Sequence, residues 1–125
     1  MKRIALTSAL VVSLLGSALS AQAIVPTTFN STITIGSAVP LYHGKVRSRL
    51  QSECEPDRRV ILYKKVPGFD PRVGRASTDQ AGRWKITPGG LKSGQAFYAL
   101  VRQQRLSNGI NCSPATSRVV KFVGE

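Results

Sequence analysis

The sequence predicts an all-β fold, namely an antiparallel Greek-key β-sandwich of about seven strands held by one disulfide. Short segments that alternate apolar and polar residues recur along the chain, and Gly, Pro, Asn and Asp separate them at regular intervals. No stretch of about ten residues or more has the apolar period and caps of a helix. The chain has 125 residues, which suits one domain of this architecture.

The first 23 residues have the layout of a secretory signal peptide. Lys2 and Arg3 form a basic start, residues 4–19 are apolar or small and uncharged, and residues 21–23 read A-Q-A, a cleavage pattern. A membrane anchor is the alternative, but the apolar run is short and no basic flank follows it. We expect removal of residues 1–23, leaving residues 24–125 as a single β-sandwich domain without a transmembrane segment. The protein is then secreted, to an extracellular space or a periplasm.

Cys54 and Cys112 are the only cysteines in the sequence. An even number of cysteines in an exported protein predicts an intramolecular disulfide. A metal site is the weaker interpretation, because no C-x-x-C spacing and no nearby histidine supplies further ligands. We therefore expect one disulfide, no metal and no cofactor.

The first half of the expected domain contains four candidate strands. They are residues 32–35, 42–50, 59–66 and 72–77. In the second of them, Lys45, Arg47 and Arg49 share the face opposite the apolar one. The third is apolar on both faces, which is typical of a central strand covered on both sides.

Three further candidate strands complete the expected sandwich. They are residues 83–87, 95–103 and 117–123. A type I turn precedes the first of them, with Asp79 at its start and Gly82 at its end. Trp84 is expected in the core. Phe97 and Tyr98 lie on opposite faces of the most strongly patterned strand, and both are also expected in the core.

Two spaced motifs surround this turn and the strand after it. Residues 78–84 read T-D-x-x-G-x-W, and residues 91–98 read L-x-x-G-x-x-F-Y. Together they resemble the prealbumin-like β-sandwiches, which include transthyretin-like, carboxypeptidase-regulatory-like and Cna-B-type domains. The resemblance implies a sandwich over residues 42–122.

The resemblance implies no activity for this chain. Transthyretin-like hydrolases use several histidines, an arginine and a C-terminal Y-R-G-S motif, whereas this chain has His43 alone and ends K-F-V-G-E. Cna-B-type domains often carry a Lys–Asn isopeptide bond, but residues 117–123 contain neither Asn nor Asp. Glu53, Glu55 and Asp57 are close in sequence and are expected to form a solvated loop rather than a catalytic pair. We predict no enzymatic activity.

The charge balance indicates anionic partners. The sequence has 18 Lys and Arg against 6 Asp and Glu, a formal charge of +12, of which +10 would stay after loss of the signal peptide. The candidate anion-binding residues are Lys45, Arg47, Arg49, Arg58, Arg59, Lys64 and Lys65. Acidic polysaccharide and anionic lipid surfaces are the expected ligands, bound through salt-sensitive contacts. Specific nucleic-acid binding is not expected, because the aromatic residues are assigned to the core and the protein is exported.

The predicted function is therefore a secreted, non-catalytic binding or structural module at the cell envelope. An ordinary solvated surface is one alternative, since Lys and Arg also protect exposed strand edges. A small secreted enzyme or enzyme inhibitor is another, and an inhibitor would show a protruding loop at residues 67–71 or 102–114. An accessory subunit of an envelope complex would show an exposed apolar patch.

Overall fold

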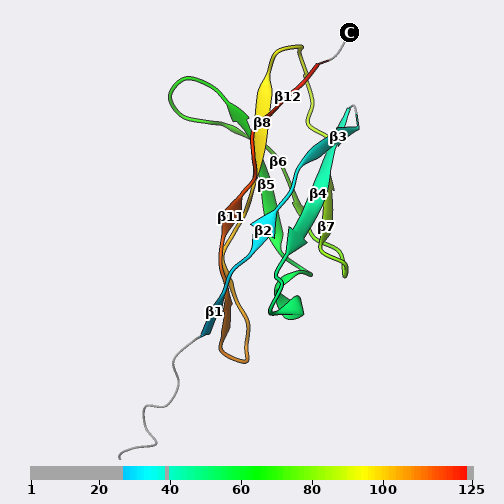
Figure 1. Ribbon diagram of the computed structural model, residues 1–125. Coiled ribbons are helices and arrows are strands. Elements are labelled where there is room, and N and C mark those ends of the chain that lie inside the picture. Colours follow the sequence, from blue (N-terminus) through cyan, green and yellow to red (C-terminus); the bar gives the residue numbers. More distant parts are fainter. Residues whose placement is uncertain (1–26, 39, 124–125) are drawn as a thin grey trace, which may run out of the picture.

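The computed structural model describes residues 27–38 and 40–123, and these form an all-β structure (Figure 1). The expected signal peptide, residues 1–23, lies outside the described residues. Within them, the one helical element is a single 3₁₀ turn, η1 (Ser52–Cys54). Two antiparallel sheets pack on each other, and a small third sheet lies at the end marked by β1. The all-β sandwich predicted from the sequence is confirmed.

The first sheet is built around one central strand. This strand is β4 (Leu41–Arg47); β2 (Thr32–Ile33) and β3 (Gly36–Ala38) follow each other along one edge of it, and β7 (Arg83–Ile86) pairs with it as well. All three pairings are antiparallel. Gly44 lies opposite Trp84, and a Cβ at Gly44 would collide with the Thr34 carbonyl. A glycine is therefore required where β4 passes the preceding strand.

The second sheet has the order β6, β5, β8, with two short strands along the far edge of β8. The strands are β5 (Arg59–Lys65), β6 (Arg72–Ser77), β8 (Ala96–Val101), β11 (Ala115–Thr116) and β12 (Val120–Lys121). A register shift between Leu62 and Tyr63 interrupts the pairing of β5 with β6. The pairs β4–β7 and β5–β8 join strands that are not consecutive in sequence, which is the Greek-key feature of the fold.

The core lies between the two sheets and takes alternate residues from each. The first sheet and its connections contribute Ile33, Ile35, Tyr42, Val46, Trp84 and Ile86, and the second contributes Val60, Leu62, Phe97, Ala99, Val101 and Phe122. The core positions expected for Trp84 and Phe97 are confirmed.

Tyr98 is not a core residue, and that expectation is wrong. It follows Phe97 on β8, so the alternation of the strand directs it to the outer face of the second sheet. There it is half-buried and stacks on Tyr63, with ring centroids 5.3 Å apart.

The third sheet was not expected from the sequence. It contains β1 (Thr27–Phe29), β9 (Gln104–Arg105) and β10 (Ile110–Cys112), and β1 runs parallel to β10. The predicted disulfide between Cys54 and Cys112 is present, and it joins η1 to β10 with both cysteines fully buried. The strand expected at residues 95–103 ends at Val101 in β8, and the chain continues into the β9–β10 hairpin.

The turn before β7 is organised as the sequence predicts. The Asp79 carboxylate accepts hydrogen bonds from the backbone N–H groups of Ala81 and Arg83, each at 2.9 Å. The N–H of Gly82 donates to the Asp79 carbonyl at 2.9 Å. Gly82 has a φ of +80°, a left-handed conformation that favours glycine.

Candidate anion-binding face

The cations singled out from the sequence do not gather in one place. Those of the first sheet and the turn after it are Lys45, Arg47 and Arg49; those on β5 are Arg59, Lys64 and Lys65. Lys65 is already paired, since its Nζ lies 3.9 Å from a carboxylate oxygen of Asp70. The expected set is therefore divided between two sheets.

Arg58 is not a surface cation, and its assignment to an anion-binding surface is wrong. Its exposed fraction is 0%, which makes it the largest of the fully buried side chains. Arg58 immediately precedes β5 and shares the inward alternation of Val60 and Leu62, whereas Arg59 faces out. A polymer in solution cannot reach its guanidinium.

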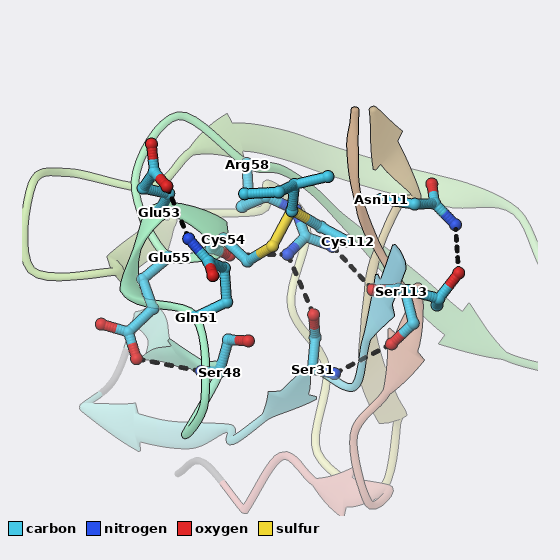
Figure 2. Close-up of a disulfide and its surroundings, with 12 residues drawn as sticks. Ser31, Ser48, Gln51, Glu53, Cys54, Glu55, Arg58, Asn111, Cys112 and Ser113 are labelled. Atoms are coloured by element: carbon cyan, nitrogen blue, oxygen red, sulfur yellow. Dashed lines mark hydrogen bonds between the residues drawn. A yellow bond between two sulfur atoms is a disulfide. The ribbon is translucent and has the colours of Figure 1, made fainter. Parts of the chain in front are cut away.

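The Arg58 guanidinium binds backbone oxygens and a hydroxyl beside the disulfide (Figure 2). Its Nη1 donates to the Cys54 carbonyl at 2.6 Å and to Oγ of Ser31 at 3.1 Å. Its Nη2 donates to the carbonyls of Ser113 at 2.8 Å and Arg102 at 2.9 Å. Burial lowers the pKa of Arg58, although an arginine keeps its proton at neutral pH. One buried charge thus ties together four separate segments of the chain.

Four other arginines converge on the outer face of the second sheet. Arg59 lies on β5, Arg72 and Arg75 lie on β6, and Arg102 directly follows β8; together they line a hollow of about 250 Å³ beside Ile61. The strand register brings them together, since Ile61 pairs with Arg75, and the Arg102 N–H donates to the Arg59 carbonyl at 3.0 Å. We call Arg59, Arg72, Arg75 and Arg102 the arginine face.

Arg59 lies at the centre of this face. It also lines a hollow of about 330 Å³ towards β9 and one of about 340 Å³ towards the end of β6. The first contains Asp57, Arg102, Gln103 and Gln104, and the second contains Arg75, Ala76 and Ser77. Three hollows therefore share Arg59 as a lining residue.

No residue of the arginine face forms an ion pair with a carboxylate within the part of the chain that the structure describes, although Asp57 lines a hollow with Arg59 and Arg102. The ion pairs found there join Lys65 to Asp70 and Arg83 to Asp79, outside the face. Arg102, the residue after β8, lies opposite Arg59 of β5, and like charges in that position destabilise a sheet. Natural proteins accept such local costs mainly at functional sites. Guanidinium groups suit this role because they form paired hydrogen bonds to carboxylate, sulfate or phosphate.

Two stacked tyrosines adjoin the face but already have partners. Tyr98 stacks on Tyr63, its hydroxyl donates to Asp70 at 2.7 Å, and Nζ of Lys65 lies 6.0 Å from its ring centroid. The bond to Asp70 raises the pKa of Tyr98 to about 12. The backbone N–H of Val66 and, next, the Tyr98 hydroxyl lower the pKa of Asp70. These rings therefore differ from the open stacking platforms that bind nucleic-acid bases.

A second cationic hollow belongs to the other sheet. Arg47 and Arg49 line a hollow of about 600 Å³ together with Phe29, Leu50 and three polar residues. Its lining is more apolar than that of the arginine face, and Leu50 is 84% exposed at its rim. It shares no lining residue with the arginine face.

His43 lies in a hollow of about 520 Å³ that Ser77 and Asp79 also line. A nucleophilic triad needs hydrogen bonds from the nucleophile to the base and from the base to the acid. Asp79 instead binds the backbone of Ala81 and Arg83, and the Arg83 bond foremost lowers the pKa of Asp79. Among the described residues, His43 has no hydrogen bond to Ser77 or Asp79. The three side chains are neighbours without the geometry of a triad.

Metal ligands are not grouped in the part of the chain described here. Residues 27–38 and 40–123 contain no group of three or more His, Cys, Asp or Glu side chains that could hold an ion. Over the same ranges, no helix has the length and apolar character needed to cross a membrane.

Sequence reasoning missed Arg102 and gave Arg72 and Arg75 no place among the candidate residues. Arg102 follows the inward-facing Val101, so strand alternation alone could have placed it on the outer face with Arg59. Strand alternation could not have predicted which residues of β6 lie beside Arg59, because the β5–β6 pairing contains a register shift between Leu62 and Tyr63.

Comparisons with known proteins identify no family for this chain. No protein-family model and no curated protein matches it. Its fold has a low similarity to part of the pectate lyase PelI from Erwinia chrysanthemi, solved with tetragalacturonic acid, with a TM-score of 0.40 and 14% identity. That match covers 74% of this chain and 28% of the lyase. A 9R-lipoxygenase from Cyanothece has a TM-score of 0.32 and 13% identity over 75% of this chain and 14% of the lipoxygenase.

Proposed function

We propose that this protein is a secreted, non-catalytic module that binds an anionic polymer of the cell envelope through the arginine face. The observation that carries the proposal is the convergence of Arg59, Arg72, Arg75 and Arg102 from β5, β6 and the residue after β8, none of which forms an ion pair with an acid among the described residues. Several cations on one rigid sheet can contact successive charges of a polymer, and such contacts add up along the chain.

Export supports an envelope ligand. The N-terminal layout predicts a signal peptide, and the buried disulfide between Cys54 and Cys112 is typical of proteins outside the reducing cytosol. Acidic polysaccharides and anionic lipids are the abundant polyanions of that environment. The face needs no cofactor to bind them, because the guanidinium groups supply both charge and hydrogen bonds.

The position of the tyrosines favours oxyanion binding over nucleic-acid binding. Single-stranded nucleic acids combine backbone contacts with bases stacked on free aromatic rings. Tyr63 and Tyr98 stack on each other here. The Tyr98 hydroxyl binds Asp70, and the Lys65 ammonium lies near the Tyr98 ring. The arginine face thus offers charge and hydrogen bonds without an open base platform.

Two charge-matched variants test the proposal. The first replaces Arg59, Arg75 and Arg102 of the arginine face with Gln, and the second replaces Lys45, Arg47 and Lys85 of the first sheet with Gln. Both remove three positive charges, so a difference between them reports position rather than net charge. We expect the arginine-face variant to bind an alginate oligomer at least about tenfold more weakly than the control variant. Equal losses in both variants would contradict the proposal.

A further inference from the structure

One end of the arginine face contains hydrogen-bond acceptors as well as cations. The hollow of about 330 Å³ towards β9 is lined by Arg59 and Arg102 and by Asp57, Gln103 and Gln104. We call it the Asp57 hollow. A carboxylate that lines the same hollow as two arginines weakens a site that recognises charge alone, because it repels the anion. A carboxylate in this place suits a ligand that carries hydrogen-bond donors as well as negative charge.

The Asp57 carboxylate is available to a ligand. Asp57 is exposed, and within the described residues it forms no ion pair with Arg59 or Arg102, although both line the same hollow. Its backbone is fixed, because its N–H donates to the Thr78 carbonyl at 3.1 Å, and the next N–H, of Arg58, donates to Oγ1 of Thr78 at 2.8 Å. A fixed backbone and an uncommitted carboxylate make Asp57 an acceptor held in place.

Gln103 is held in a complementary way. Its Nε2 donates to Oδ1 of Asn111 at 2.8 Å, and Nδ2 of Asn111 donates to Oγ1 of Thr28 at 3.1 Å. These hydrogen bonds orient the Gln103 amide through its Nε2 group, so its Oε1 atom stays available as an acceptor. The two acceptors, Asp57 and Gln103, therefore line the same hollow as two guanidinium donors.

The buried Arg58 side chain holds part of the backbone that forms the Asp57 hollow. Arg58 lies between Asp57 and Arg59 in sequence, and its buried Nη2 donates to the Arg102 carbonyl at 2.9 Å. The buried Arg58 side chain thus holds the backbone of Arg102, while Arg58 itself is the sequence neighbour of Asp57 and Arg59. Arg58 is a positioning residue and does not contact the ligand.

The chemistry of the hollow selects among polyanions. Phosphate chains and simple polycarboxylates present anionic oxygens without hydroxyl donors, so Asp57 can only repel them. A uronic acid presents one carboxylate and several hydroxyl groups on a single ring. We propose that the Asp57 hollow is a subsite for one uronic acid unit of an acidic polysaccharide, in which Arg59 and Arg102 bind the carboxylate and Asp57 and Gln103 accept hydroxyl hydrogens. This inference rests on the function proposed for the arginine face.

Two probes of the same charge type test the subsite. An oligomannuronate carries carboxylates and hydroxyl groups, whereas a polyacrylate with the same number of carboxylates carries no hydroxyl groups. In Asp57→Asn, we expect affinity for oligomannuronate to fall about tenfold, because a hydrogen bond to a charged group is lost. Affinity for polyacrylate should rise about twofold, because a repelling charge is removed. Asn also tolerates the positive φ of 54° at this position, so the variant retains the loop conformation.

A neutral variant and an acidic control complete the test. Gln103→Met should weaken oligomannuronate binding and leave polyacrylate binding unchanged. Glu53→Gln removes an exposed carboxylate outside the hollow and should strengthen both probes equally. The subsite is excluded if Asp57→Asn also strengthens both probes equally. Retention of polyacrylate binding after loss of Arg59, Arg75 and Arg102 would instead overturn the function proposed for the whole face.

Discussion

At the scale of single residues, Arg58 and Arg59 show how one position in a strand decides a role. The two are chemically identical neighbours, yet Arg58 is fully buried and Arg59 is exposed. Amino-acid composition cannot distinguish a buried arginine from an exposed one, so the sequence predicts anion binding for both. The inward positions of Val60 and Leu62 predict the direction of Arg58, but an arginine without an acidic partner is rare in a protein interior. Its partners are carbonyls from distant segments, which no sequence motif reveals.

Replacement of Arg58 tests its structural role. In Arg58→Met, the carbonyls of Cys54, Arg102 and Ser113 would lose their charged donor while staying buried. We expect the free energy of unfolding to fall by about 3 kcal/mol, as for other buried groups left without a partner. Urea denaturation followed by circular dichroism measures this change.

Arg59→Met is the matched control, since Arg59 is exposed and adjacent. It should change the free energy of unfolding by no more than about 0.5 kcal/mol. Equal effects at the two positions would mean that the hydrogen bonds of Arg58 do not contribute to stability.

At the scale of elements, the disulfide connects two segments that do not pair with each other as strands. It joins the short turn η1 to β10 across a sequence separation of 58 residues. In the chain-entropy account, closing a loop of this length in the unfolded state stabilises the fold by about 4 kcal/mol.

A Cys54→Ala/Cys112→Ala double variant should therefore unfold at a lower urea concentration by an amount that corresponds to about 4 kcal/mol. The reducing agent dithiothreitol should destabilise the natural protein and leave the double variant unaffected. An unchanged midpoint after complete reduction would show that other contacts hold η1 and β10 together.

The loop between β5 and β6 is held by Asp70. Its carboxylate accepts from the Val66 N–H at 2.9 Å and from the Tyr98 hydroxyl at 2.7 Å. The loop protrudes from the sandwich in Figure 1 and presents Phe69, which is 92% exposed. A protruding loop is the feature expected of an inhibitor, whereas an accessory subunit was expected to show an exposed apolar patch, of which Phe69 is one residue; both alternatives stay predictions.

The lowered pKa of Asp70 predicts a loss of stability in acid. The folded state favours the ionised carboxylate, so its contribution is present above the ordinary pKa of 3.8 and is lost as the pH falls through the lower folded value. The free energy of unfolding should decrease more steeply below about pH 4 in the natural protein than in Asp70→Asn. Parallel curves for the two proteins would contradict this prediction.

The same pair predicts a shift at high pH. The folded state favours protonated Tyr98, whose pKa is raised to about 12, so this contribution is present below pH 10 and is lost between the ordinary value of 10.0 and the raised one. Burial also raises the pKa of Tyr42 above its ordinary value, so phenolate absorbance should be compared between the natural protein, in which Tyr98 titrates near pH 12, and Asp70→Asn. In Asp70→Asn that titration should move towards pH 10.0; an unchanged profile would contradict the assignment.

The elements themselves were partly predictable. Alternation located the strands that became β4, β7 and β8, because each buries one face in a two-sheet core, whereas an apolar run located β5 and the turn residues on either side bounded β6. Alternation could not locate β1, β9 and β10, which contain two or three residues each and therefore carry no period. The parallel pairing of β1 with β10 joins residues that are far apart in sequence, and only the folded chain brings them together.

At the scale of the whole molecule, composition predicts an anionic partner but carries no information on where such a partner would bind. The excess of Lys and Arg favours anionic ligands whatever the fold. The arginine face depends on the order of β6, β5 and β8 and on the register between them. The motif resemblance to prealbumin-like sandwiches stays a prediction, since no family model matches the chain.

The central claim is that one face of the sandwich makes the contacts with the polyanion, and the salt dependence of binding tests it most directly. The measurement is the slope of log K against log salt concentration for an alginate oligomer. Replacement of Arg59, Arg75 and Arg102 with Gln should reduce the magnitude of this slope by about two to three. Replacement of Lys45, Arg47 and Lys85 should leave it unchanged. Equal slopes for the two variants would show that binding follows net charge and that the arginine face is not the site.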